Sequence, residues 1–184
     1  IKKALSYLGV KYIYSKGTEA DDYIASIALS LKEMGEVIIS SFDSDFFQLI
    51  SERVSALRYR GNASVMWDEK HFMEEFGFSP CFYTLYKAIV GDSADNIKGI
   101  KGMGKKRTSS FIRRYEESGA WCNSMLPLSL RERLGEEKDT IIRNLKLIEF
   151  KNVETRVNWD ELGFFKEKVE EGNTVVLENS GVFN

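Results

Sequence analysis

The order of apolar and polar positions predicts alternating strands and helices in the first half of the chain. Val10–Tyr14 and Glu36–Ser41 are short apolar runs typical of buried strands. Between them, apolar residues recur at helical spacing, which predicts a helix that begins at Thr18 and ends at Gly35. A second helical stretch covers residues 46–50. The succession of strand, helix, strand and helix favours an α/β fold with a mostly parallel sheet.

The second half of the chain is mainly helical. Two apolar runs, Val54–Tyr59 and Val65–Trp67, flank a glycine-containing turn and predict a hairpin. Helices are expected at about Asp68–Phe76, Pro80–Val90, Gly104–Tyr115, Ser129–Leu147 and Glu161–Glu171, with a late strand over Thr174–Leu177. We therefore expect an α/β part over residues 1–79, a helical subdomain over 80–147 and a C-terminal return to the α/β part over 148–184.

Composition and charge limit the possible classes of protein. With 184 residues, 43% hydrophobic and 29% charged, the chain can bury a globular core, and no apolar run is long enough to span a bilayer. We expect no membrane partner. The net charge of −2 means that any surface for nucleic acid must be a local basic patch. Two cysteines, Cys81 and Cys122, are too few for a disulfide framework and indicate a reducing interior.

Acidic residues gather at three places where strands or helices end. Any one group could simply cap a helix; Thr18–Asp21, for example, has the form of a capping box. However, the loops that follow parallel strands meet at one edge of the sheet, where such folds bind their ligands. The three groups are Glu19, Asp21 and Asp22; Asp43 and Asp45; and Asp92 and Asp95.

Carboxylates brought together in this way require a cation or protonation. Two of them about 4 Å apart repel by roughly 4 kcal/mol at an effective dielectric constant of 20. Ligands that are all oxygen suit Mg²⁺ or Mn²⁺ rather than Zn²⁺. Two such ions would activate a water and stabilise the leaving oxygen of a phosphodiester. The single histidine, His71, offers no competing Ser–His or Cys–His nucleophile.

A basic, glycine-punctuated segment follows the third acidic group. No acid occurs from Asn96 to Tyr115, and apolar Ile100 and Met103 would anchor a tight turn before the next helix. The free N–H groups at that helix start can hold a phosphate. A solvated basic helix is the simpler alternative; the glycine spacing favours a helix-hairpin-helix grip on a DNA backbone. The candidate DNA-binding residues are Lys98, Gly99, Lys101, Gly102, Gly104, Lys105, Lys106 and Arg107.

Four ordered motifs, Gly17–Asp22, Ser41–Asp45, Gly91–Ile97 and Gly99–Lys106, resemble those of the 5′-nuclease superfamily. This superfamily comprises flap endonucleases, bacteriophage 5′-exonucleases, which look most similar, and the 5′-nuclease domain of bacterial DNA polymerase I. The resemblance implies a PIN-like, Rossmann-like domain with a helix-hairpin-helix subdomain. It also implies Mg²⁺-dependent hydrolysis of 5′ ends, 5′ flaps and branched or nicked duplex DNA, in the cytoplasm of a bacterial or phage-infected cell.

The resemblance also implies roles for individual residues. Glu19 and Asp21 would bind the first of two Mg²⁺ ions, Asp21 and Asp43 would lie near both, and Asp22 would act through a water. Mn²⁺ would substitute for Mg²⁺, and K⁺ would bind the carbonyls of the hairpin. The chain departs from the family at Lys98 and Lys101, where proline is usual. The second ion would be bound by Asp45, Asp92 and Asp95.

The family also opens with a strand and a basic helical arch that carry two further metal-binding aspartates, and we find neither in this sequence. We therefore expect that an N-terminal segment of the parent chain, or a second polypeptide, completes the first metal site. Two alternatives remain: an inactive module that binds branched DNA, and a PIN-type ribonuclease. Retention of all seven acids argues against the first, and the duplex-gripping hairpin against the second.

Overall fold

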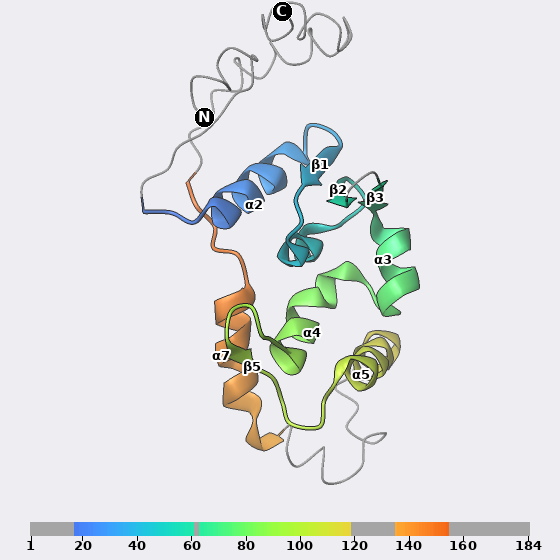
Figure 1. Ribbon diagram of the computed structural model, residues 1–184, viewed down its shortest axis with the longest axis vertical. Coiled ribbons are helices and arrows are strands. Elements are labelled where there is room, and N and C mark those ends of the chain that lie inside the picture. The colour runs from blue at the N-terminus through green and yellow to red at the C-terminus, as the bar shows by residue number, and fades with distance from the viewer. Residues whose placement is uncertain (1–16, 61–62, 119–134, 155–184) are drawn as a thin grey trace, which may run out of the picture.

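The computed structural model describes residues 17–60, 63–118 and 135–154 (Figure 1). The strand expected at Val10–Tyr14, the first residues of the helix expected at Ser129–Leu147, and the elements expected after residue 160 lie outside these ranges. No helix in the described ranges is long and apolar enough to cross a membrane. In chain order the elements are α2 (Ala20–Leu31), β1 (Val37–Ser40), the 3₁₀ helix η1 (Ser44–Leu49), β2 (Val54–Arg60), β3 (Ala63–Trp67), α3 (Glu69–Phe76), the 3₁₀ helix η2 (Pro80–Phe82), α4 (Tyr83–Val90), β4 (Gly91–Asp92), β5 (Ile97–Lys98), α5 (Lys105–Ser118) and α7 (Lys138–Ile148).

The larger sheet has three strands in the order β1-β2-β3. β1 pairs in parallel with β2, with Val37 opposite Val54, and β2 pairs antiparallel with β3, with Ala56 opposite Trp67. The expected parallel pairing and the expected hairpin are therefore both confirmed, and the described sheet is mixed rather than wholly parallel. η1 leaves the carboxyl end of β1, which is the sheet edge where ligands were expected.

Helix α2 covers this sheet through a small apolar core. Its buried Ala25 and Ala28 pack with Ile39 of β1 and Phe46 of η1. The helix begins at Ala20, with Glu19 in the N-cap position and no side-chain cap, so the capping-box interpretation of the preceding residues is wrong. A side-chain cap therefore does not explain Glu19, while Asp21 and Asp22 in the first turn are favoured by the helix dipole.

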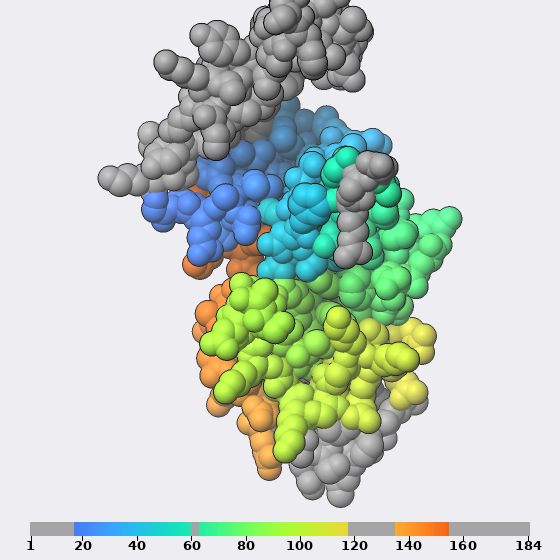
Figure 2. All heavy atoms as spheres, in the orientation of Figure 1, coloured from blue at the N-terminus to red at the C-terminus, as the bar shows by residue number. Residues whose placement is uncertain are grey.

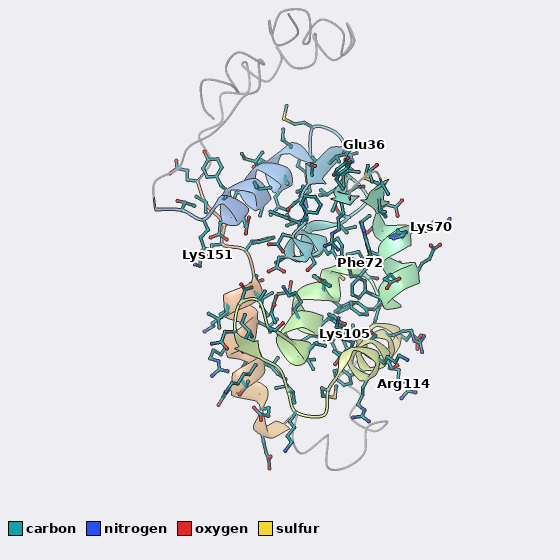
Figure 3. The ribbon with its side chains drawn as sticks, viewed as in Figure 1. Glu36, Lys70, Phe72, Lys105, Arg114 and Lys151 are labelled. Carbon is teal, nitrogen blue, oxygen red and sulfur yellow. The ribbon has the colours of Figure 1, made fainter. Side chains whose placement is uncertain are left out.

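Helix α4 lies at the centre of the second, larger core, between α7 and α5 (Figure 1). Aromatic rings join it to its neighbours: fully buried Phe72 of α3, labelled in Figure 3, lies 5.5 Å from Tyr83 and 6.0 Å from Phe47, between ring centroids. Edge-to-face rings at these separations stabilise packing beyond the apolar area that they bury. Phe47 belongs to η1, so the core fixes η1 against the start of α4.

A two-stranded hairpin, β4–β5, follows α4 where the sequence predicted only a turn between helices. Gly91 and Asp92 pair antiparallel with Lys98 and Ile97. The buried side-chain amide of Asn144 in α7 donates hydrogen bonds of 2.9 Å to the carbonyls of Ala88 and Lys98. This amide therefore ties α7 to both α4 and the hairpin.

Gly99 permits the close approach of this hairpin to the end of α4. A Cβ atom at residue 99 would lie 2.0 Å from the carbonyl oxygen of Val90 and 2.3 Å from its carbonyl carbon. Gly91 is equally confined, with φ of +86° and an ideal Cβ 2.4 Å from the nitrogen of Gly99. Backbone atoms cannot yield as a flexible side chain can. The chain therefore requires glycine at both positions for packing.

Gly99→Ala is expected to lower the free energy of unfolding by about 3 kcal/mol, because the backbones must separate to admit a methyl group. Urea denaturation followed by circular dichroism measures the loss. Gly104→Ala is the matched control, since a Cβ there meets no atom within 4 Å and should change stability by less than about 1 kcal/mol. Equal effects of the two substitutions would rule out close packing as the reason for Gly99.

Candidate metal and nucleic-acid site

An acidic cleft of about 540 Å³ opens at the start of α2. Figure 2 shows the blue start of α2 directly above the green atoms of the β4–β5 hairpin on this face. The residues that follow α7 form another wall of the cleft. Its acidic lining residues are Glu19, Asp21, Asp22, Asp43, Asp45, Asp95 and Glu149.

Three of the predicted acids form a compact cluster. Asp45 of η1, Asp92 of β4 and Asp95 of the β4–β5 turn each offer a carboxylate oxygen within 4.8 Å of the other two. Asp45 and Asp95 also line the cleft. Within the described ranges, no other three His, Cys, Asp or Glu groups approach one another as closely. The donor set is all carboxylate oxygen, which suits a hard divalent cation.

Local hydrogen bonds set the directions of these acids. An Oδ1 atom of Asp43 accepts the N–H of Asp45 at 2.8 Å, and the N–H of Asp43 donates to Oγ of Ser41 at 3.1 Å. Asp92 similarly accepts the N–H of Ala94 at 2.8 Å. Asp43 thus caps η1, as the simpler interpretation expected, and the same turn directs Asp45 toward the cluster.

Glu19, Asp21 and Asp22 line the same cleft. Within the described structure they do not form a cluster as compact as that of Asp45, Asp92 and Asp95. The pKa of Asp21 is raised, first by its partial burial and then by the negative charges of Asp43 and Glu19. The acids after β1 and those at the start of α2 therefore interact electrostatically, as their positions in the sequence predicted. A cation in the cleft would relieve this repulsion.

Asp22 lines the cleft and also binds the returning chain. It is only 6% exposed, and its Oδ1 atom accepts the N–H of Lys151 at 2.8 Å. One turn on, Oγ of Ser26 accepts the N–H of Val153 at 2.9 Å and donates to the Asp22 carbonyl. We call residues 149–153 the return strap; Lys151 is labelled beside the start of α2 in Figure 3. Asp22 thus has a structural bond that the sequence did not reveal.

Lys87 is a member of the site that the sequence analysis missed. This residue of α4 is 6% exposed, and its Nζ forms ion pairs with Oδ1 of Asp45 and Oδ2 of Asp92. In the sequence, the signal for this residue is a single charged side chain in the otherwise mainly apolar segment 83–90. Burial alone would lower the pKa of Lys87, but hydrogen bonds to both carboxylates raise it.

The two carboxylates respond differently to the same lysine. Burial raises the pKa of Asp45, and the contact with Lys87 only partly offsets this increase. The pKa of Asp92 is lowered: burial raises it, but the hydrogen bonds from Lys87 and from the Ala94 N–H outweigh burial. Burial weighs more on Asp45, whose pKa the charges of Asp43 and Asp92 also raise, whereas backbone hydrogen bonds stabilise the Asp92 anion.

Gln48 is the second residue that the sequence did not reveal. Its side-chain amide donates to the carbonyls of Asp45 at 3.0 Å and Ile148 at 3.2 Å. Its Oε1 atom accepts the N–H of Phe150 at 3.4 Å, in the return strap. Gln48 therefore connects the peptide of a clustered acid to the end of α7.

The basic segment lies beyond the hairpin and leads into α5. Buried Ile100 and Met103, 4% and 2% exposed, anchor the turn as predicted. Gly102 has φ of +89°, and its carbonyl accepts a hydrogen bond from the Arg107 guanidinium. A surface groove is lined by Gly104, Lys105, Lys106, Arg107 and Ser110. Lys98 and Lys101 are exposed, whereas Gly99 packs internally, so its place in the structure is explained without a phosphate.

Sequence comparisons identify relatives along most of the chain. Residues 1–77 match the profile of the 5′-3′ exonuclease N-terminal resolvase-like domain. The thermostable DNA polymerase I of Thermus thermophilus is 34% identical over 152 residues, which cover 80% of this chain and 18% of the polymerase. A 5′-3′ exonuclease of Bacillus subtilis is 36% identical over 117 residues, which cover 62% of this chain and 40% of the exonuclease. The chain thus spans less than half the length of these relatives.

The fold agrees with these sequence relationships. A crystal structure of the bacteriophage T5 D15 flap endonuclease, in a pseudo-enzyme-product complex with DNA and metal ions, superimposes with a TM-score of 0.66 at 22% identity. The match covers 96% of this chain and 62% of the phage protein. At this identity the likeness shows a shared fold, and the relatives above supply the sequence relationship. The chain therefore carries a 5′-3′ exonuclease N-terminal resolvase-like domain over residues 1–77 and is a homologue of 5′-3′ exonucleases and of DNA polymerase I.

Proposed function

We propose that this chain carries the metal-binding and DNA-binding parts of a structure-specific 5′-nuclease, which acts as a 5′-3′ exonuclease or flap endonuclease on DNA. The observation that carries the proposal is the compact cluster of Asp45, Asp92 and Asp95, two of which line the acidic cleft, in a chain that also carries a basic groove at the start of α5. The relatives support the same activity, since they include a named 5′-3′ exonuclease. The substrates proposed are 5′ flaps and branched or nicked duplexes.

We propose that the acidic residues hold two divalent cations, Mg²⁺ with Mn²⁺ as a substitute. Asp45, Asp92 and Asp95 would hold one ion through oxygen atoms that already lie within 4.8 Å of each other. Glu19 and Asp21 would hold the other, with Asp21 and Asp43 near both ions and with Asp22 acting through a water. When bound, such ions stabilise charge developing on a phosphoryl group and make water a better nucleophile.

The residues of the chain position the DNA and the acids. Lys98, Lys101 and the first turn of α5 would contact phosphates of the duplex, and the glycine-rich backbone before α5 allows their close approach. We also propose that K⁺ binds backbone carbonyls of this glycine-rich segment. The hydrogen bonds of Gln48 fix the backbone of Asp45 relative to the end of α7. DNA bound by the helical subdomain would therefore lie at a fixed distance from the cleft.

The organisation of the chain follows from this assignment. Residues 1–79 would form the α/β metal-binding part, 80–147 the DNA-binding subdomain and 148–184 the return to the α/β part. The described acids that line the first site are not clustered like those of the second, which supports a further contribution from an N-terminal segment, in the parent chain or from another polypeptide. The proposed location is the cytoplasm of a bacterial or phage-infected cell.

Cleavage of a labelled 5′-flap DNA in Mg²⁺ tests the proposal. The chain is incubated with the flap alone and with an added N-terminal nuclease polypeptide from a relative. We expect robust cleavage at the flap junction only with the added polypeptide, and none in EDTA. Equal cleavage without the polypeptide would refute the dependence on it, and cleavage in EDTA would refute the metal mechanism.

The same assay distinguishes the two alternatives. An inactive DNA-binding module would retain flap binding and show no metal-dependent cleavage under either condition. A PIN-type ribonuclease would cleave an RNA flap in preference to the DNA flap of the same sequence. The basic groove at the start of α5 favours a duplex DNA substrate, because it offers contacts to a backbone rather than to splayed bases.

A further inference from the structure

The buried side chain of Lys87 contacts the carboxylate cluster from the protein interior. Its side chain is 7% exposed, in the last turn of α4, and its Nζ contacts Oδ1 of Asp45 and Oδ2 of Asp92. A fully or nearly buried lysine is rare unless it is paired, and here both partners belong to the cluster. The ammonium therefore neutralises part of a negative charge that three neighbouring carboxylates would otherwise impose.

Both oxygens of Asp92 are already engaged. Oδ1 accepts the N–H of Ala94 at 2.8 Å, and Oδ2 contacts the lysine ammonium. Asp45 likewise gives Oδ1 to Lys87. A divalent cation that uses these oxygens must share them with an ammonium group, and like charges at contact distance repel strongly in a half-buried setting.

We propose that Lys87 is a built-in counter-ion of the Asp45–Asp92–Asp95 cluster, which holds the three carboxylates together before a divalent cation binds and leaves Asp92 when one does. This inference rests on the proposed metal site and adds a residue that sets its affinity. In the metal-free protein Lys87 keeps the cluster assembled; in the loaded protein its ammonium has withdrawn from Asp92. The lysine thus makes the site ordered but weaker for metal than the carboxylates alone.

Calorimetric titration with Mn²⁺ tests the effect on affinity. Lys87→Met keeps the length and the apolar stem and removes the charge, so the dissociation constant of the second site should fall by roughly tenfold or more. Lys87→Arg retains the charge and should stay within roughly threefold of the wild type. Unchanged or weaker binding by the methionine variant would overturn the inference.

Chemical labelling of the wild-type chain gives a test that needs no variant. Lysines are methylated with formaldehyde and borohydride, with and without saturating Mg²⁺, and quantified by mass spectrometry. Lys87 should be protected without Mg²⁺ and become several-fold more reactive with it, while exposed Lys70 should not change. Equal protection of Lys87 in both conditions would overturn the inference.

Mn²⁺ binding by the Asp92→Asn variant distinguishes a failure of this inference from a failure of the proposed function. If the wild type binds no Mn²⁺, or binds it as Asp92→Asn does, the metal site itself is refuted. If the wild type binds Mn²⁺ through Asp92 and the lysine variants do not differ, only the role of Lys87 is refuted.

Discussion

Asp92→Asn is expected to reduce flap cleavage by about a thousandfold in the assembled nuclease. The substitution keeps the shape of the side chain and its contact with the Ala94 N–H, but it removes one negative charge from the cluster. Ion-bound catalysis is worth several kcal/mol, and about 1.4 kcal/mol corresponds to a tenfold change in rate. Single-turnover cleavage with saturating enzyme measures the chemical step without a contribution from binding.

Binding of flap DNA by the same variant should be unchanged or tighter, because less negative charge then faces the phosphates. Fluorescence anisotropy in Ca²⁺ or EDTA measures it. Asp139→Asn on the exposed first turn of α7 is the matched control and should cleave as the wild type does. Cleavage by Asp92→Asn within tenfold of the wild type would remove Asp92 from the catalytic site.

Lys105→Ala combined with Lys106→Ala is expected to weaken DNA binding at least roughly tenfold at low salt, since each lysine neutralises a phosphate. The slope of log affinity against log salt should become shallower by about 1.8, or about 0.9 for each neutralised phosphate of a duplex. Anisotropy titrations at four salt concentrations measure both quantities. The loss should be equal for flaps of different sequence, because backbone contacts carry no sequence information.

Lys32→Ala with Lys70→Ala removes the same charge from the C-cap of α2 and from α3, away from the groove at the start of α5. This control pair should leave the salt slope unchanged. Figure 3 shows Lys70 on the outer side of α3, well apart from Lys105. A slope that shifts equally in both double variants would mean that overall charge, not the basic groove, determines binding.

The parts of the fold that depend on neighbouring residues could be predicted from the sequence. β1, the β2–β3 hairpin and helix α3 all follow from local patterns, and Asp68 caps α3 by accepting the N–H of His71 at 2.7 Å. The approach of the acidic groups was predictable as well, because loops after strands meet at one sheet edge. The assignment of individual carboxylates to individual ions remains a prediction.

The parts that depend on distant residues could not be predicted. Lys87 resembles an ordinary surface lysine until tertiary packing buries it between Asp45 and Asp92. Gly99 was assigned to DNA binding, whereas its confinement against Val90 appears only when β4 and β5 pair. Asp22 was grouped with its acidic neighbours, yet its partner is a backbone amide 129 positions later in the chain. No periodicity within a short window reports such contacts.

The return strap has a consequence for the order in which the protein folds. Its hydrogen bonds join Asp22 to Lys151 and Ser26 to Val153, across 129 and 127 residues. Closing loops of this length costs chain entropy before the contacts compensate, so these bonds form late. On a ribosome, α2 and β1 emerge long before the strap does. The acidic cleft therefore gains its last wall only after residue 151 has been made, whereas Asp45, Asp92 and Asp95 of the compact cluster have all been synthesised by residue 95.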